Sequence, residues 1–294
     1  MKQLVFVHGR AQEHKEAVAL KGEWIAAFRE GLAKSQLQLP IGEDAIRFPY
    51  YGQTLYDLVS NKPPDQVATV IVRGDNADEN ERAFMRAVIQ EVKQKAGISD
   101  AQLAEIAGQD VIARGPLNWE WLQGILKAID RYVPLASGAS IAITTNDVYQ
   151  YLNNPGIRDE IETGVRQAMQ PHVPTVVVSH SLGTVVSYNL LRREGKANRW
   201  VVPLYITLGS PLAVTAIKKG LAPNKHPECV GTWFNAMDER DVVALYPLDR
   251  ENFPITPSIE NKRDVHNHTE NRHGISGYLN DKEVAKRIYD ALVA

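Results

Sequence analysis

The chain lacks several features that mark particular classes of protein. It has a single cysteine, Cys229, so no disulfide can form within it. Its 33 lysines and arginines nearly balance its 35 aspartates and glutamates, which leaves no general attraction to nucleic acid. The apolar run near the start, Leu4 to Val7, is too short for a signal peptide or a membrane span. We therefore expect a cytoplasmic protein with no integral membrane association and no nucleic-acid partner.

Sequence motifs for common cofactors and metals are also missing. The glycines form neither the G-x-G-x-x-G nor the Walker pattern of a nucleotide site. His266, His268 and His273 lie close together, but their spacing matches no strong zinc motif and no cysteine accompanies them. We expect neither a cofactor nor a bound metal.

The chain does contain an alternation of apolar runs and helical patterns. Strands that alternate with helices indicate an α/β protein with a mostly parallel, doubly wound sheet and helices on both faces. Residues 141–170 predict two helices with a break at residues 153–156, and the apolar spacing after Asp281 predicts a closing helix. At 294 residues one domain, 1–294, is the simplest organisation. The predicted strands are Leu4 to Val7, Asp44 to Phe48, Pro174 to Val178, Trp200 to Leu208 and Val230 to Met237.

Residues 53–140 interrupt the alternation. They contain helical patterns over residues 79–95 and 118–132, and no convincing run of core strands. Because this stretch follows the second predicted strand, we expect a mainly helical cap above the carboxyl edge of the sheet, where active-site loops lie. The apolar face of residues 118–132 packs either on the core or over the site. In the second case Trp119 and Trp121 contact the substrate.

The residues Ser179-His180-Ser181-Leu182-Gly183 follow a predicted strand and precede a helical pattern. A serine in such a strand-turn-helix sits in a strained turn where a base can reach its hydroxyl, so Ser181 is a candidate nucleophile. Ser179 and Gly183 are small enough for the tight turn, although serine replaces the usual glycine at the first position. The alternative is that Ser181 only caps the helix.

A serine nucleophile needs a histidine base, and the base works best beside a carboxylate. Asp241 follows the strand that is predicted to end at residue 237, and His273 precedes the closing helix. Asp238 is an alternative acid, and the two histidines before His273 are alternative bases. We expect His180 to pack behind Ser181 and not to act as the base.

These residues resemble the α/β-hydrolase superfamily, and in particular its lipase and esterase branch. The chain order Ser181, Asp241, His273 is the nucleophile, acid and base order of that family. His8-Gly9 resembles the family's His-Gly turn, and the resemblance implies an oxyanion hole formed by the backbone N–H groups of Arg10 and Leu182.

The resemblance also implies an activity. It predicts an α/β-hydrolase fold that cleaves a small ester or a lipid-like substrate through an acyl-enzyme, without a cofactor. We further predict that His8, Tyr50 and Tyr51, at the ends of the first two strands, contact the substrate. The alternatives are a thioesterase or amidase with the same triad, and a catalytically silent hydrolase fold that only binds a ligand.

Overall fold

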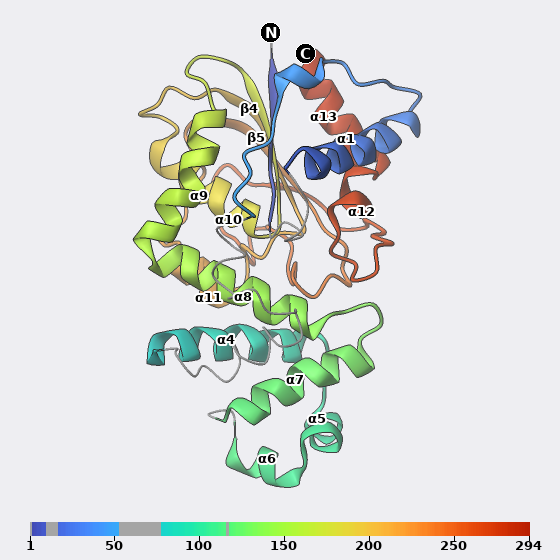
Figure 1. The fold of residues 1–294 in the computed structure, drawn as a ribbon, viewed down its shortest axis with the longest axis vertical. Helices are drawn as coiled ribbons and strands as arrows, with labels where there is room; N and C mark the ends of the chain where they lie inside the picture. The colour runs from blue at the N-terminus through green and yellow to red at the C-terminus, as the bar shows by residue number, and fades with distance from the viewer. Residues whose placement is uncertain (1, 10–16, 53–77, 116–117) are drawn as a thin grey trace.

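The computed structural model describes residues 2–9, 17–52, 78–115 and 118–294 (Figure 1). Its strands form one parallel sheet in the order β2-β1-β3-β4-β5-β6. The chain adds β2 on one side of β1 and the later strands on the other, so the order reverses between β1 and β3. Ligands of open parallel sheets bind at such a reversal, outside the carboxyl ends of the strands. The strands are β1 (Gln3–Val7), β2 (Ile46–Arg47), β3 (Thr175–His180), β4 (Val202–Leu208), β5 (Val230–Ala236) and β6 (Glu260–Lys262).

Helices cover both faces of this sheet (Figure 1). Alternate side chains of β1 point to opposite faces, as the pleat of a strand requires. Leu4 and Phe6 pack with α1 and α13, whereas Val5 and Val7 pack in the core that includes α10. The α/β class and the parallel sheet are therefore confirmed. One face carries α1 (Ala17–Ala33), α12 (Ile275–Leu279) and α13 (Lys282–Val293), and the other carries α9 (Pro155–Ala168) and α10 (Leu182–Glu194), with α11 (Thr215–Gly220) nearby.

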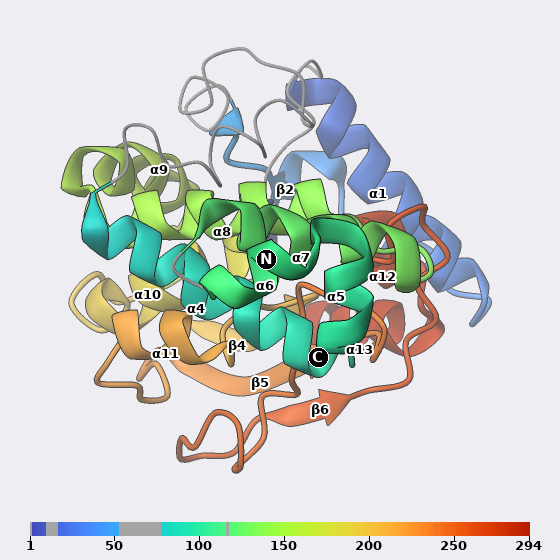
Figure 2. The same ribbon diagram turned by 90° about the horizontal axis from the view of Figure 1, so that it is seen from below.

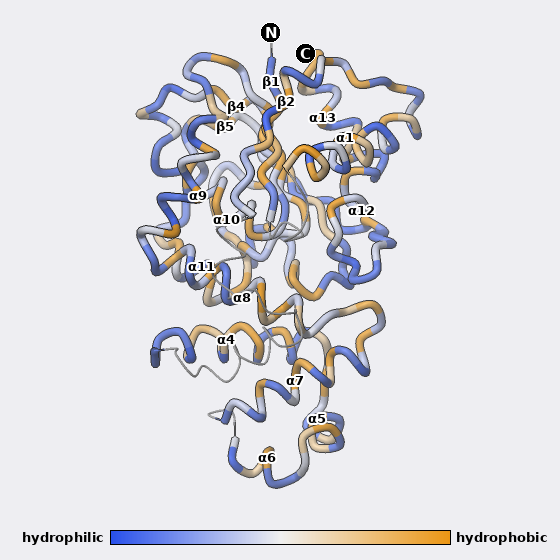
Figure 3. The backbone as a smooth tube through the Cα atoms, in the orientation of Figure 1, coloured by the Kyte–Doolittle hydropathy of each residue, from blue (hydrophilic) through white to orange (hydrophobic). Residues whose placement is uncertain are grey.

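A helical layer lies across the carboxyl edge of the sheet (Figures 1 and 2). α8 lies nearest the sheet, and the colouring in Figure 3 alternates along α4 and α7, as expected for helices with one packed face. One continuous apolar core joins Val177 of β3, Val185 of α10 and Val148 of α8 to this layer. The layer is α4 (Glu79–Lys95), α5 (Asp100–Ala107), α6 (Gln109–Arg114), α7 (Trp119–Tyr132) and α8 (Gly138–Asn153).

Local capping signals explain where several helices begin. The side chain of Asp78 accepts a hydrogen bond from the N–H of Glu81, which fixes the start of α4. Both bounds of α4 agree with those predicted from its helical pattern. Asn154 caps α9 ahead of Pro155, which is where the sequence predicted a break. No helix within the described ranges combines the length and apolar character that crossing a bilayer requires.

Several predicted bounds differ from the structure. The strand predicted over residues 44–48 is reduced to Ile46–Arg47, because Glu43–Ala45 forms a turn of 3-10 helix before it. β3 continues two residues beyond the predicted end at Val178. The predicted cap boundary at residue 140 lies inside α8, and residues 53–77 of the predicted cap lie outside the described residues.

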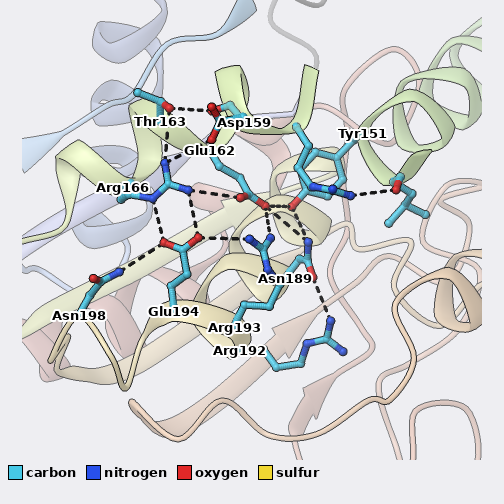
Figure 4. Close-up of polar contacts among 12 residues, drawn as sticks. Tyr151, Asp159, Glu162, Thr163, Arg166, Asn189, Arg192, Arg193, Glu194 and Asn198 are labelled. Atoms are coloured by element: carbon cyan, nitrogen blue, oxygen red, sulfur yellow. Dashed lines mark hydrogen bonds and ion pairs between the residues drawn. The ribbon is translucent and has the colours of Figure 1, made fainter. Parts of the chain in front are cut away.

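A buried carboxylate joins α8, α9 and α10 (Figure 4). Glu162 is 1% exposed, and its Oε1 accepts a hydrogen bond of 2.6 Å from the hydroxyl of Tyr151. The same oxygen lies 2.8 Å from Nη1 of Arg193, and Oε2 lies 3.5 Å from Nη2 of Arg166. Arg166 also donates two hydrogen bonds to Glu194. Because Arg193 and Glu194 belong to α10, these bonds tie α9 to that helix.

We predict that Glu162→Gln lowers the free energy of unfolding by about 1 to 3 kcal/mol, because the amide breaks ion pairs that are shielded from water. Urea denaturation of both proteins measures the difference. Asp159→Asn is the control, since Asp159 lies 3.9 Å from Arg166 and is largely exposed; it should change stability by less than about 0.5 kcal/mol. Equal effects of the two substitutions would contradict the prediction.

Candidate active site

Ser181 occupies the sharp turn between β3 and α10. Its backbone has φ 54° and ψ −129°, a conformation that side-chain-bearing residues rarely adopt. The N–H of Ser181 donates to the carbonyl of Leu208 in β4 (3.1 Å), which helps to hold the turn at the sheet edge. Strain of this kind is typical of functional turns and costs about 1 to 3 kcal/mol. Ser181 is therefore not a simple helix cap, and its side chain caps no amide of α10.

Two glycines allow the turn to form at this place. A Cβ on Gly183 would lie 2.3 Å from the carbonyl oxygen of Val7, and one on Gly9 would lie 2.7 Å from Cβ of Ser181. The ends of β1 and β3 thus approach too closely for any larger residue at either position. Serine is accommodated at position 179, where its buried hydroxyl donates to the carbonyl of Ile206 (3.1 Å).

Three side chains predicted from distant parts of the sequence meet at this turn. Nε2 of His273 lies 2.8 Å from Oγ of Ser181, and Nδ1 of His273 lies 2.7 Å from Oδ2 of Asp241. All three residues are buried. A histidine between a hydroxyl and a carboxylate can take the hydroxyl proton while the carboxylate stabilises the imidazolium.

The structure distinguishes between the alternatives for acid and base. Both carboxylate oxygens of Asp238 bond backbone groups: Oδ1 accepts from the N–H of Arg240 and Oδ2 from the N–H of Asn267. The alternative bases, His266 and His268, are both exposed side chains. Asp241 and His273 are therefore the pair next to Ser181.

The carboxylate of Asp241 is held by more than the histidine. The hydroxyl of Tyr278 donates to Oδ2 (2.6 Å), and the N–H of Val243 donates to Oδ1 (2.9 Å). Burial alone would raise the pKa of Asp241, but the charge of His273 and these hydrogen bonds outweigh it and lower the pKa. The aspartate therefore stays ionised. The sequence did not assign this role to Tyr278; its one signal was a tyrosine on the helix just after His273.

Two further histidines are buried behind the site as neutral groups. The Nε2–H of His180 donates to the backbone carbonyl of His273 (2.7 Å), and burial lowers the pKa of His180 to about 3. The Nδ1–H of His8 donates to the carbonyl of Gly9 (2.5 Å), and Nε2 of His8 accepts from the N–H of Tyr51 (3.2 Å). Burial lowers the pKa of His8 to about 4. Both rings hold the backbone beside Ser181.

One of the two predicted oxyanion donors, Leu182, lies at the same turn. Leu182 is the first residue of α10, so its N–H has no acceptor within the helix and lies at the positive end of the helix dipole. Arg10 lies outside the described residues. Gly9, its neighbour, is in contact distance of Ser181.

The other predicted substrate contacts lie in two places. Tyr51 is buried and its ring stacks on His8 at 4.0 Å, while Tyr50 is half-buried with its ring 5.5 Å from the same histidine. Trp119 is half-buried on α7, and Trp121 is buried in the core that the helical layer shares with the sheet. As substrate contacts these four residues, and His8, remain predictions.

Other chemistry-bearing groups are not assembled into a site in the described residues. No group of three or more His, Cys, Asp or Glu side chains among them is placed to hold a metal ion. Cys229 is half-buried, and burial raises the pKa of its thiol to about 11, so the thiol stays protonated near neutral pH.

The buried neutral histidines predict an acid-sensitive fold. Their folded-state pKa values lie below the ordinary value of about 6.5, so the unfolded chain binds more protons, and stability is lost as the pH falls through the window between these values. Between about pH 4.5 and 5.5 the free energy of unfolding rises with pH. We expect His180→Gln to lower the slope of this rise by about 1.4 kcal/mol per pH unit. Urea denaturation at several pH values measures the slope. The exposed His268→Gln should leave it unchanged, and a slope unaffected in both variants would refute the assignment.

Comparisons with known proteins add no relative to this geometry. No protein-family model, no curated protein and no solved structure matches the chain significantly. The conclusions about the site therefore rest on the residues themselves.

Proposed function

We propose that this protein is a serine hydrolase that cleaves a carboxylic ester through an acyl-enzyme. The observation that carries the proposal is the continuous chain of hydrogen-bond distances from Ser181 through His273 to Asp241, at a strained turn on the carboxyl edge of the sheet. A buried, ionised aspartate next to a histidine has a clear use where the histidine must become positively charged. The resemblance to the α/β-hydrolase superfamily agrees with this assignment.

In the proposed reaction, Oγ of Ser181 attacks the ester carbonyl carbon while Nε2 of His273 takes its proton. Asp241 stabilises the imidazolium, and the oxyanion receives hydrogen bonds from the N–H groups of Leu182 and Arg10. The imidazolium then gives its proton to the departing alkoxide, which leaves as the alcohol. Water repeats these steps in the second half, releases the acid and restores Ser181.

The positions of Tyr278 and His180 support the same assignment. Tyr278 fixes one oxygen of Asp241, and His180 fixes the backbone carbonyl of His273. Each bond restricts a partner of the histidine, so the imidazole is held between the serine and the acid before a substrate arrives. A thioester or an amide would react with the same three side chains. Turnover measurements with an ester, a thioester and an amide would show which substrate the protein cleaves.

We predict that Ser181→Ala lowers kcat for para-nitrophenyl acetate by roughly four to six orders of magnitude and abolishes labelling by a fluorophosphonate probe, because the triad acts as a unit. Gel fluorescence measures the labelling, and circular dichroism checks the fold. Ser187→Ala is the matched control, since Ser187 lies six residues after Ser181 and its hydroxyl donates to the carbonyl of Gly183 within α10. Labelling that persists in Ser181→Ala would identify another nucleophile. A wild type that does not label would favour a ligand-binding module.

A second prediction compares the two candidate acids. Asp241→Asn should lower kcat by up to about four orders of magnitude near neutral pH, because an amide permits the wrong histidine tautomer. Asp238→Asn should reduce kcat by less than about tenfold, since Asp238 bonds backbone N–H groups and not the histidine. Steady-state kinetics on both variants, with melting temperatures to verify folding, separates the two. The reverse ranking would require the roles to be exchanged.

A further inference from the structure

A cavity of about 260 Å³ lies between the helical layer and the loop that carries Asp241. Its wall includes Lys95 at the end of α4, Val133 after α7, and Arg240, Asp241 and Arg272 from the sheet domain. Asp241 bonds His273, and Arg272 directly precedes His273 in the chain. The cavity is therefore adjacent to the candidate triad, on the side of the acid.

Positive charge dominates this wall. The side chain of Asp241 is completely buried, so its carboxylate is not exposed to the cavity. Glu239, the other acidic lining residue, lies 2.9 Å from Nη2 of Arg263. The ammonium of Lys95 lies 5.1 Å from the centre of the Tyr246 ring, with no carboxylate partner within the described residues. Lys95 therefore contributes a positive charge that the wall does not neutralise.

Two arginines of the wall share one carboxylate. Nη1 of Arg272 lies 3.5 Å from Oδ2 of Asp238, and Nε of Arg240 lies 3.6 Å from Oδ1. Both distances are longer than those of a good charge-assisted hydrogen bond, and the two oxygens already accept backbone N–H groups. One carboxylate thus faces two guanidinium groups, which leaves a second unneutralised charge.

Arg272 is the least exposed of the three cationic side chains on this wall. Its side chain is only 15% exposed, whereas that of Arg240 is 58% exposed and Lys95 is an exposed residue. Its Nε is closed off from solvent and has no hydrogen-bond partner among the described residues, so a ligand in the cavity would contact the terminal nitrogens of the guanidinium. The N–H groups of a guanidinium match the oxygens of a carboxylate or a phosphate.

An apolar cavity adjoins this charged one. Val242 and Leu245 line both, and Pro211, Val214 and Ile217 line only the apolar one. The apolar cavity holds only about 20 Å³, room for one small group, so the apolar part of a ligand that spans the two must be short. The volume of the charged cavity, about 260 Å³, is small for a ligand site, which favours a short acid over a long acyl chain.

We infer that the substrate carries a carboxylate or phosphate group, and that Arg272, with Lys95 and Arg240, binds it in this cavity while the ester reaches Ser181. This inference rests on the proposed function and narrows it to esters with an anionic end. The oxyanion neutralises the excess positive charge that Lys95, Arg240 and Arg272 leave on this wall.

The test compares esters that differ in one terminal group. The para-nitrophenyl hemiester of glutaric acid and para-nitrophenyl pentanoate have the same acyl length, but one ends in a carboxylate and the other in a methyl group. For the wild type we expect kcat/KM to be about tenfold or more higher with the hemiester. A third ester of the same length, ending in phosphate, shows which oxyanion is preferred. In Arg272→Gln the ratio of hemiester to pentanoate should fall to about one.

Two other variants make the comparison specific. Lys95→Gln should reduce the same ratio by a smaller factor, and it tests the inference without disturbing Asp238, in case Arg272→Gln folds poorly. Arg131→Gln is the control: Arg131 lies on α7, outside the cavity lining, and pairs with Glu105. It removes an equal charge and should keep the wild-type ratio within about twofold, because exposed charges are screened by salt.

A binding measurement separates this inference from the proposed function. Titration calorimetry of Ser181→Ala with glutarate and with inorganic phosphate needs no catalysis, and binding of either should be lost when Arg272→Gln is added. If glutarate or phosphate binds but no ester is turned over, the proposed hydrolase activity is refuted and the anion site is supported. If the two esters are turned over at equal rates and neither anion binds, the anion site is refuted and the proposed hydrolase activity is supported.

Discussion

The close approach of β1 and β3 at their carboxyl ends is the constraint on which the rest of the site depends. Gly183 lies against the carbonyl of Val7, and Gly9 lies against the side chain of Ser181, so neither position has room for a Cβ. This contact places the strained turn at the reversal of strand order, where a parallel sheet leaves a crevice. The strain of the serine is supported by buried hydrogen bonds around it and by the core on both faces of the sheet.

A second consequence of that arrangement is a buried polar network around His273. Its ring nitrogens are within hydrogen-bond distance of Ser181 and Asp241, its backbone carbonyl accepts from His180, and Tyr278 completes the bonding of the acid. Such groups are costly to bury unless they are paired, and here each has a partner. Nε of Arg272, beside the same network, is the exception: it is buried with no hydrogen-bond partner among the described residues.

The helical layer shows where sequence patterns succeed and where they do not. α4 and α7 were predicted closely because each has a capping residue and an apolar face that recurs at helical spacing. α5 and α6 were not predicted, since they are short and have little periodicity, and β6 has three residues with polar side chains. The strand predicted at residues 44–48 was too long, because its register with β1 extends over only two residue pairs.

By itself the sequence determined the α/β class, the parallel sheet, and Ser181, Asp241 and His273 as candidates, since these follow from local periodicity, turn residues and chain order. It left Asp238 open as the acid, because two aspartates three residues apart look alike until the loop after β5 is folded. Only the tertiary structure placed Asp241, and not Asp238, beside His273, and only it brought Tyr278 to that carboxylate and Arg272 to the charged cavity. Contacts between residues far apart in the chain depend on how strands and helices pack, and no local pattern encodes them.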